Sequence, residues 1–251
     1  MEAGYRILPP YYDRWQRSYG KDFSSLILPR LLATIRAHRI AGPTMVDVAC
    51  GTGTLALMMA RRGWKVFGVD ASEGMLACAS VKPVAKTLEV SFIQQDMREM
   101  RLPRRVNLAT SFFDSLNHLL NAEDLARTFR RVRDALVPMG YFVFDLNNER
   151  CFSTLWTQSE TVTGEGFTLL LENSYDKAAR VAVSNVTITP KGGKGEILQE
   201  TVHERFYPAD EIRTMLKQTG FSVKECEDFN FTSNPAVGKL KTWWVAECAA
   251  G

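Results

Sequence analysis

The feature that most constrains the fold is a regular alternation of strand and helix signals along the first 150 residues. Short apolar runs typical of buried strands are separated by stretches in which apolar residues recur at helical spacing. Strands are predicted at 44–49, 65–69, 88–94, 106–112 and 141–146, and helices at 22–39, 55–62, 73–79 and 123–136. Strands joined by helices of this length form a parallel sheet with helices on both faces. We therefore predict a doubly wound, mostly parallel α/β fold, in which Pro29 kinks or divides the first helix.

The pattern changes after Arg150 and returns near residue 207. Three strands joined by turns are predicted at 167–175, 181–189 and 197–206, and a helix at 208–218 and strands at 221–226 and 241–247 then bring the main sheet to seven strands. The expected organisation is a core of residues 1–150 and 207–251, interrupted by an antiparallel insertion at 151–206. An insertion at this point is expected to fold over the carboxyl edge of the main sheet as a substrate cover. Its exposed edges would equally suit a homodimer interface.

Composition argues against several classes of protein. A net charge of +3 on 251 residues gives no reason to expect nucleic acid or an anionic membrane as a partner, and no apolar run is long enough to cross a bilayer. The amino terminus shows no secretory signal. The five cysteines are odd in number and scattered, which predicts reduced thiols in a cytoplasmic protein. No Cys or His spacing resembles a metal site, so no metal is expected.

The most informative segment follows the first predicted strand. Asp47 lies in that strand, and Gly51-Thr52-Gly53 forms a Gly-x-Gly turn that opens a helix. Such a turn lets a ligand approach the backbone closely at the carboxyl edge of the sheet. The turn alone does not identify the ligand, because dinucleotide-binding proteins use the same one.

Three acids narrow the choice of ligand. Asp70 ends the second predicted strand and Asp96 follows the third, so both are expected beside Asp47 at one edge of the sheet. Asp70 can accept the two hydroxyls of a ribose, and Asp96 with the backbone N–H of Met97 can bind an adenine. Asp47 would repel a pyrophosphate over the turn but attract the ammonium and sulfonium of S-adenosylmethionine. The acids therefore favour S-adenosylmethionine over NAD, although Asp70 or Ser72 can also simply cap the next helix.

These segments resemble the motifs of class I S-adenosylmethionine-dependent methyltransferases. Residues 47–54 are similar to their first motif, 69–76 to the second and 95–98 to the third, while 113–119 and 203–207 resemble later segments of small-molecule members. Residues 12–13 and 19–23 resemble the lid helix of sugar-amine N,N-dimethyltransferases and of enzymes similar to glycine N-methyltransferase. Asn107 departs from the pattern, because many members have an acid there. The resemblance implies a Rossmann-like methyltransferase fold that acts on a small molecule and releases S-adenosylhomocysteine.

The resemblance also implies roles for individual residues. Gly51 and Gly53 would contact the methionine part of the cofactor, Asp70 the ribose, and Asp96 with Met97 the adenine. The aromatic residues would line the pocket or close over it. The full set expected to bind the cofactor is Tyr12, Tyr19, Asp47, Gly51, Thr52, Gly53, Asp70, Ala71, Met75, Asp96, Met97, Phe112 and Phe113.

The acceptor determines whether a base is needed. A protonated amine must lose a proton before it can accept a methyl group, whereas a carboxylate or thiolate need not. The candidate bases are His118, His203 and Tyr12. His118 is the strongest of them because it follows the fourth predicted strand, near the active edge; the alternative is a hydrogen-bonded structural histidine.

Two other functions remain open from the sequence. Arginines crowd the helix at 123–136 and precede the fourth strand, and an RNA or protein methyltransferase would need such a patch near its pocket. Arg104 and Arg105, however, are expected at the opposite edge of the sheet, so we predict no nucleic-acid partner. A non-catalytic protein that binds S-adenosylmethionine is the other alternative, because cofactor motifs report binding rather than turnover.

Overall fold

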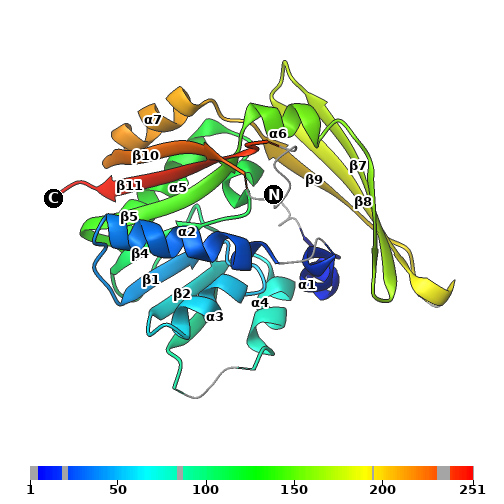
Figure 1. The fold of residues 1–251 in the computed structure, drawn as a ribbon, viewed down its shortest axis with the longest axis horizontal. Helices are drawn as coiled ribbons and strands as arrows, with labels where there is room; N and C mark the ends of the chain where they lie inside the picture. Colours follow the sequence, from blue (N-terminus) through cyan, green and yellow to red (C-terminus); the bar gives the residue numbers. More distant parts are fainter. Residues whose placement is uncertain (1–4, 19–21, 84–86, 194, 231–237, 251) are drawn as a thin grey trace.

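A seven-stranded sheet forms the centre of the molecule (Figure 1). The computed structural model describes residues 5–18, 22–83, 87–193, 195–230 and 238–250. From one edge to the other the strands are β10 (Phe221–Phe229), β11 (Lys241–Cys248), β5 (Leu136–Asn147), β4 (Val106–Ser111), β1 (Thr44–Val48), β2 (Lys65–Asp70) and β3 (Val90–Gln94). β11 runs antiparallel to both of its neighbours, and the other adjacent pairs are parallel. The predicted doubly wound, mostly parallel fold is confirmed.

Helices cover both faces of this sheet. The helices that pack on this sheet are α2 (Phe23–Ala37), α3 (Thr54–Ala60), α4 (Glu73–Ser80), α5 (Ala122–Ala135) and α7 (Ala209–Gln218). Side chains of α5 and α7 share one buried apolar cluster, while those of α2 and α3 belong to a second cluster. α2 is a single element that continues through Pro29, so the helix is not divided there, and the kink, which is the other effect predicted for Pro29, stays a prediction. Its buried residues, among them Ile27 and Leu31, fix it against the sheet on both sides of the proline.

A second, antiparallel sheet follows β5 and a short helix, α6 (Glu149–Thr154). Its strands are β6 (Glu160–Gly164), β7 (Phe167–Asp176), β8 (Val181–Pro190) and β9 (Leu198–Arg205), with the short 3-10 helix η2 (Lys191–Gly193) after β8. The sheet has one more strand than the sequence predicts. β6 escaped prediction because Val162 is its only large apolar side chain, and pairing with β7 holds it in place.

The amino-terminal segment lies between the two sheets. Figure 1 shows α1 (Pro9–Arg17) beside α4 on one side and the second sheet on the other. Leu8 is buried in an apolar cluster with residues of the second sheet, including Phe167 and Val186. A 3-10 helix, η1 (Ser115–His118), leaves the carboxyl end of β4 toward the same region. None of the helices in the described ranges is long and apolar enough to cross a membrane.

Candidate active site

The turn after β1 uses backbone conformations that suit glycine. Gly51 and Gly53 have φ angles of +54° and +71°, a region that L-residues rarely adopt. A Cβ on Gly53 would lie 2.5 Å from Cζ of Phe92, so glycine is required there for packing. A Cβ on Gly51 would meet nothing within 4 Å, because this residue borders open space. Of the two glycines, Gly51 is the one that leaves room for a ligand.

Asp70 ties that turn to the end of β2. Its two carboxylate oxygens accept hydrogen bonds from the backbone N–H of Gly51 at 2.7 Å and of Ser72 at 2.8 Å. Ser72 also caps α4 by accepting from the N–H of Met75. Burial raises the pKa of Asp70, although these backbone donors oppose the shift. Because Asp70 is the last residue of β2, its carboxylate lies at the carboxyl edge of the sheet.

Asp47 is the most deeply buried of the three acids. Its side chain is 3% exposed and accepts a hydrogen bond of 2.7 Å from Oγ1 of Thr110 on β4. Burial raises the pKa of Asp47 to about 7, with Thr110 opposing the shift and nearby Asp70 adding to it. Asp47 is therefore ready to ionise when a positive charge approaches.

Asp96 is held in a different way. The guanidinium and backbone N–H of Arg98 both donate to it, at distances from 2.5 to 3.1 Å. These bonds lower the pKa of the Asp96 carboxyl, outweighing a partial burial that raises it. Arg98 also donates to Asp124 on α5 at 3.0 Å, which fixes the loop after β3.

A cavity of about 280 Å³ opens above these strand ends. Its lining includes ten of the residues predicted for the site, namely Tyr12, Gly51, Asp70, Ala71, Met75, Asp96, Met97, Phe113, His118 and His203. Asp47, Thr52 and Phe112 line a smaller adjoining cavity of about 60 Å³. Gly53 lines neither, and Tyr19 lies outside the described residues.

His118 lines the cavity of about 280 Å³ and is held in a defined orientation. Its Nδ1 lies 3.1 Å from the backbone carbonyl of His203, so Nδ1 carries the proton and donates. Nε2 is then the acceptor, and the hydroxyl of Tyr5 donates to it at 3.1 Å. Burial lowers the pKa of His118, which favours the neutral imidazole, although Asp114 opposes this shift. His203, by contrast, has an exposed side chain and contributes its carbonyl.

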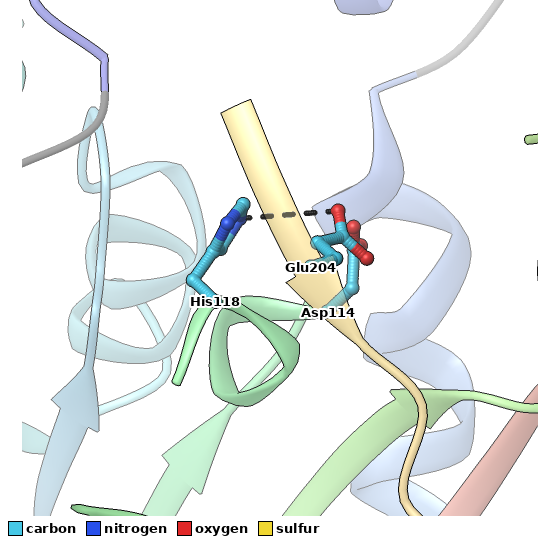
Figure 2. Close-up of side chains that lie close together, drawn as sticks. All are labelled: Asp114, His118 and Glu204. Carbon is cyan, nitrogen blue, oxygen red and sulfur yellow. Dashed lines mark ion pairs between the residues drawn. The ribbon is translucent and has the colours of Figure 1, made fainter. Parts of the chain in front are cut away.

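Two acidic side chains, Asp114 and Glu204, lie close to His118. Figure 2 shows Glu204 of β9 and Asp114 next to each other, with Oε1 of Glu204 at 4.0 Å from Nε2 of His118. Burial, followed by the charge of Asp114, raises the pKa of Glu204 well above its ordinary value. Side-chain atoms of Asp114, His118 and Glu204 that can bind a metal all lie within 4.8 Å of one another.

Lys241 supplies the positive charge beneath this pair. Its Nζ lies 2.9 Å from Asp114 and 3.6 Å from Asp145, and its side chain is 2% exposed. Burial alone would lower the pKa of Lys241, but Asp114 and then Asp145 raise it, so the lysine stays charged. Asp145 also accepts the backbone N–H groups of Phe113 and Asp114, which orients the exit of β4.

Sequence reasoning missed four residues of this region, namely Tyr5, Asp114, Glu204 and Lys241. Asp114 and Glu204 lie inside segments that resemble family motifs, so attention to every acid in them would have found both. Lys241 lies in a predicted strand, where nothing local marks a buried charge. Its partner Asp114 is 127 positions away, and only the fold brings them together.

A second cavity, of about 450 Å³, lies between the amino-terminal segment and the second sheet. It shares Tyr5, Phe113 and Val202 with the first cavity, so the two meet at the pair formed by Tyr5 and His118. Asp114 and Glu204 line the second cavity and His118 lines the first. The arrangement offers two adjoining spaces with a proton acceptor at their junction.

Comparison with known proteins agrees with this geometry. Residues 45–140 match the family described as a methyltransferase domain. A putative methyltransferase of Geobacillus sp. (strain WCH70) is 29% identical over 239 residues, covering 94% of this chain and 92% of the relative. The chain thus contains a methyltransferase domain and is similar over nearly its whole length to a putative methyltransferase.

Two further likenesses concern the branch and the fold. A dTDP-3-amino-3,4,6-trideoxy-alpha-D-glucopyranose N,N-dimethyltransferase of Streptomyces venezuelae is 28% identical over 63% of this chain and 65% of its own length. The crystal structure of an S-adenosylmethionine-dependent methyltransferase from Clostridium acetobutylicum superposes with a TM-score of 0.78 at 21% identity, covering 95% of this chain and 96% of that one. The methyltransferase fold thus extends over both sheets of this chain.

Proposed function

We propose that this methyltransferase binds S-adenosylmethionine in the 280 Å³ cavity and methylates the nitrogen of a small-molecule amine in the adjoining cavity. The observation that carries the proposal is the neutral His118, whose Nε2 is directed as an acceptor at the junction of the two cavities. The amino-sugar acceptor named for the Streptomyces relative supports an amine.

The residues around the first cavity fit the cofactor. Asp70 would accept the ribose hydroxyls, Asp96 and the N–H of Met97 would bind the adenine, and the open space at Gly51 would receive the methionine part. Asp47, which lines the smaller cavity, would lie near the positive charges of the bound cofactor. Asp70→Ala is expected to weaken cofactor binding by about 1–3 kcal/mol, because charge-assisted hydrogen bonds are lost.

His118 would accept the proton that an ammonium must lose. The Tyr5 hydroxyl shows that a donor reaches Nε2 at 3.1 Å, and an amine N–H would make the same contact. When bound, S-adenosylmethionine supplies a methyl group whose bond to sulfur breaks as the new C–N bond forms, the electron pair remaining on sulfur. The proton taken by His118 then passes to solvent, and the carbonyl of His203 keeps the imidazole aligned throughout.

The insertion is proposed to act as the substrate cover. Ser184, Val202 and Glu204 from its inner face line the second cavity, which supports a role in acceptor binding. A homodimer through its outer face is a separate proposal, which ultracentrifugation of the purified protein would test. The five free cysteines support a cytoplasmic location, also as a proposal.

Calorimetric titration with S-adenosylmethionine, S-adenosylhomocysteine and NAD tests the cofactor. Binding of the first two at micromolar concentration and silence with NAD is expected; binding of NAD alone would overturn the assignment. Release of S-adenosylhomocysteine with amines, and not with matched phenols or carboxylates, then tests the acceptor atom.

His118→Gln tests the proton acceptor. We expect kcat with a protonated amine to fall about 100-fold or more, with the rate then rising steeply with pH, because the free amine must form without help. His38→Gln is the matched control: His38 is paired with Glu225, remote from both cavities, and its substitution should leave kcat unchanged. An unchanged rate and pH profile in the His118 variant would remove this role.

A further inference from the structure

The second cavity has a strongly acidic floor. Its lining includes Asp114, the residue just before η1, together with Glu204 of β9 and Glu160 of β6. Asp145 accepts the backbone N–H of Asp114, and among the described residues Lys241 forms ion pairs with both Asp114 and Asp145. Asp114, Asp145 and Glu204 are three carboxyl groups beside one lysine, and burial and the charge of Asp114 raise the pKa of Glu204. A positively charged ligand is favoured here because it would stabilise Asp114 and allow Glu204 to ionise.

A polar group on the wall of the same cavity has no partner. Ser184 of β8 is 5% exposed, and its hydroxyl makes no hydrogen bond to any described residue. Buried hydroxyls are normally satisfied, because leaving one unpaired costs about 1–3 kcal/mol. An N–H donor from a ligand in the cavity would satisfy it.

The rest of the lining is apolar and aromatic. Trp15 of α1, Trp156 after α6 and Phe113 after β4 border the space, with Leu171 and Val186 from the second sheet. Indole and phenyl faces attract organic cations and pack well against flat apolar groups. The lining therefore fits a compact molecule with one positive end and an apolar body.

The lining gives no support for a phosphorylated ligand. Among the described residues that border this cavity, none is a lysine or an arginine. Diphosphates are normally bound by such side chains or by exposed backbone N–H groups at a helix start. A diphosphate here would instead face the carboxylates of Asp114, Glu160 and Glu204.

A metal ion fits the cluster less well than an ammonium. Lys241 already donates to Asp114 at 2.9 Å, Asn147 donates to Glu204 at 2.9 Å, and Tyr5 donates to His118 at 3.1 Å. The candidate ligands are thus engaged with donors, as they would be with the N–H groups of an ammonium. A bare ion would also leave unexplained the aromatic cavity of about 450 Å³.

We infer that the acceptor is an unphosphorylated cationic amine with a flat apolar body, whose ammonium is bound by Asp114, Glu204 and Ser184. This inference rests on the proposed function and makes it more specific. It separates this chain from the Streptomyces relative, which is named for a dTDP-linked amino sugar.

The test begins with protein saturated with S-adenosylhomocysteine, so that cofactor binding is established first. Calorimetry then compares tryptamine with indole-3-propionate, which has the same indole and chain length but a carboxylate, and with dTDP. We expect tryptamine to bind about tenfold or more tightly than indole-3-propionate, and dTDP to give no heat. Phenethylamine and 3-phenylpropionate form a second matched pair with a smaller body.

Two variants locate the binding site. Glu204→Gln keeps the shape and the bond from Asn147 and should weaken tryptamine binding about tenfold, with the affinity for S-adenosylhomocysteine unchanged. Trp156→Ala, in a half-buried position, should weaken it similarly. Glu172→Gln is the matched control, since Glu172 is an exposed carboxylate of the same sheet and does not line the cavity.

Several outcomes would overturn the inference. They are equal binding of amine and carboxylate in both pairs, competition of dTDP with tryptamine, and absence of amine binding to the saturated protein. Binding of Mn²⁺ that is lost in Glu204→Gln would replace the ammonium with a metal. Failure to bind S-adenosylhomocysteine at the first step would instead contradict the proposed function itself.

Discussion

The three acids at the strand ends are held in three ways, and this difference has consequences at the scale of single residues. Asp96 is paired with Arg98 and is ionised, and Asp70 accepts two backbone N–H groups. Among the described residues, Asp47 accepts a side-chain hydrogen bond from Thr110 alone, and burial raises its pKa to about 7. Of the three, Asp47 is therefore the one whose charge depends on what occupies the site.

This makes cofactor binding dependent on pH. A bound ligand with positive charges stabilises ionised Asp47, so its pKa is lower in the complex than in the free protein, where it is about 7. Binding then releases a proton, and affinity for S-adenosylmethionine should rise by up to about tenfold per pH unit toward pH 7 and level off above it. Calorimetry in buffers of different ionisation enthalpy measures the proton. Asp47→Asn should remove the slope; a slope that persists would assign the proton to another group.

At the scale of elements, the sequence predicted well what depends on local periodicity. The strands of the main sheet and the helices between them follow from apolar spacing, and so does the grouping of Asp47, Asp70 and Asp96 at one edge. β6 was missed because its stability comes from pairing with β7 rather than from its own side chains. Pro29 does not divide α2, which was one of its two predicted effects, because packing on the sheet holds the helix on both sides of the proline.

The glycine turn between β1 and α3 allows a matched comparison. Gly53→Ala should lower the free energy of unfolding by about 1–3 kcal/mol, because the new Cβ would lie 2.5 Å from the ring of Phe92. Gly51→Ala meets open space and should cost only about 1 kcal/mol for its left-handed backbone, while weakening cofactor binding more than Gly53→Ala does. Urea denaturation and titration with S-adenosylhomocysteine separate the two effects. A larger loss of stability at Gly51 would contradict the division of roles.

At the scale of the whole molecule, the amino-terminal segment joins the two sheets into one site. Tyr5 lines both cavities, Tyr12 lines the first, and Leu8 is buried with the second sheet. His118 of η1 meets His203 of the second sheet, and Asp114, just before η1, meets Lys241 of the main sheet. Both pairs are far apart in sequence and meet only in the folded molecule. That is why local motifs indicated many residues of the first cavity, whereas for the second cavity the sequence predicted only a cover formed by the insertion and not the individual residues that line it.

The contact between α1 and α4 makes this coupling testable from outside both cavities. Gly74 lies on the exposed side of α4, and a Cβ there would be 3.0 Å from the ring of Pro9. Gly74→Leu should therefore displace α1 and, with it, Tyr5 and Tyr12, while far-ultraviolet circular dichroism stays unchanged. Affinities for S-adenosylhomocysteine and for tryptamine should then fall together, each by about tenfold. Ala77→Leu, at an exposed position of the same helix, is the control and should change neither. If Gly74→Leu lowered only one affinity, or none, the two cavities would not depend on a common cover.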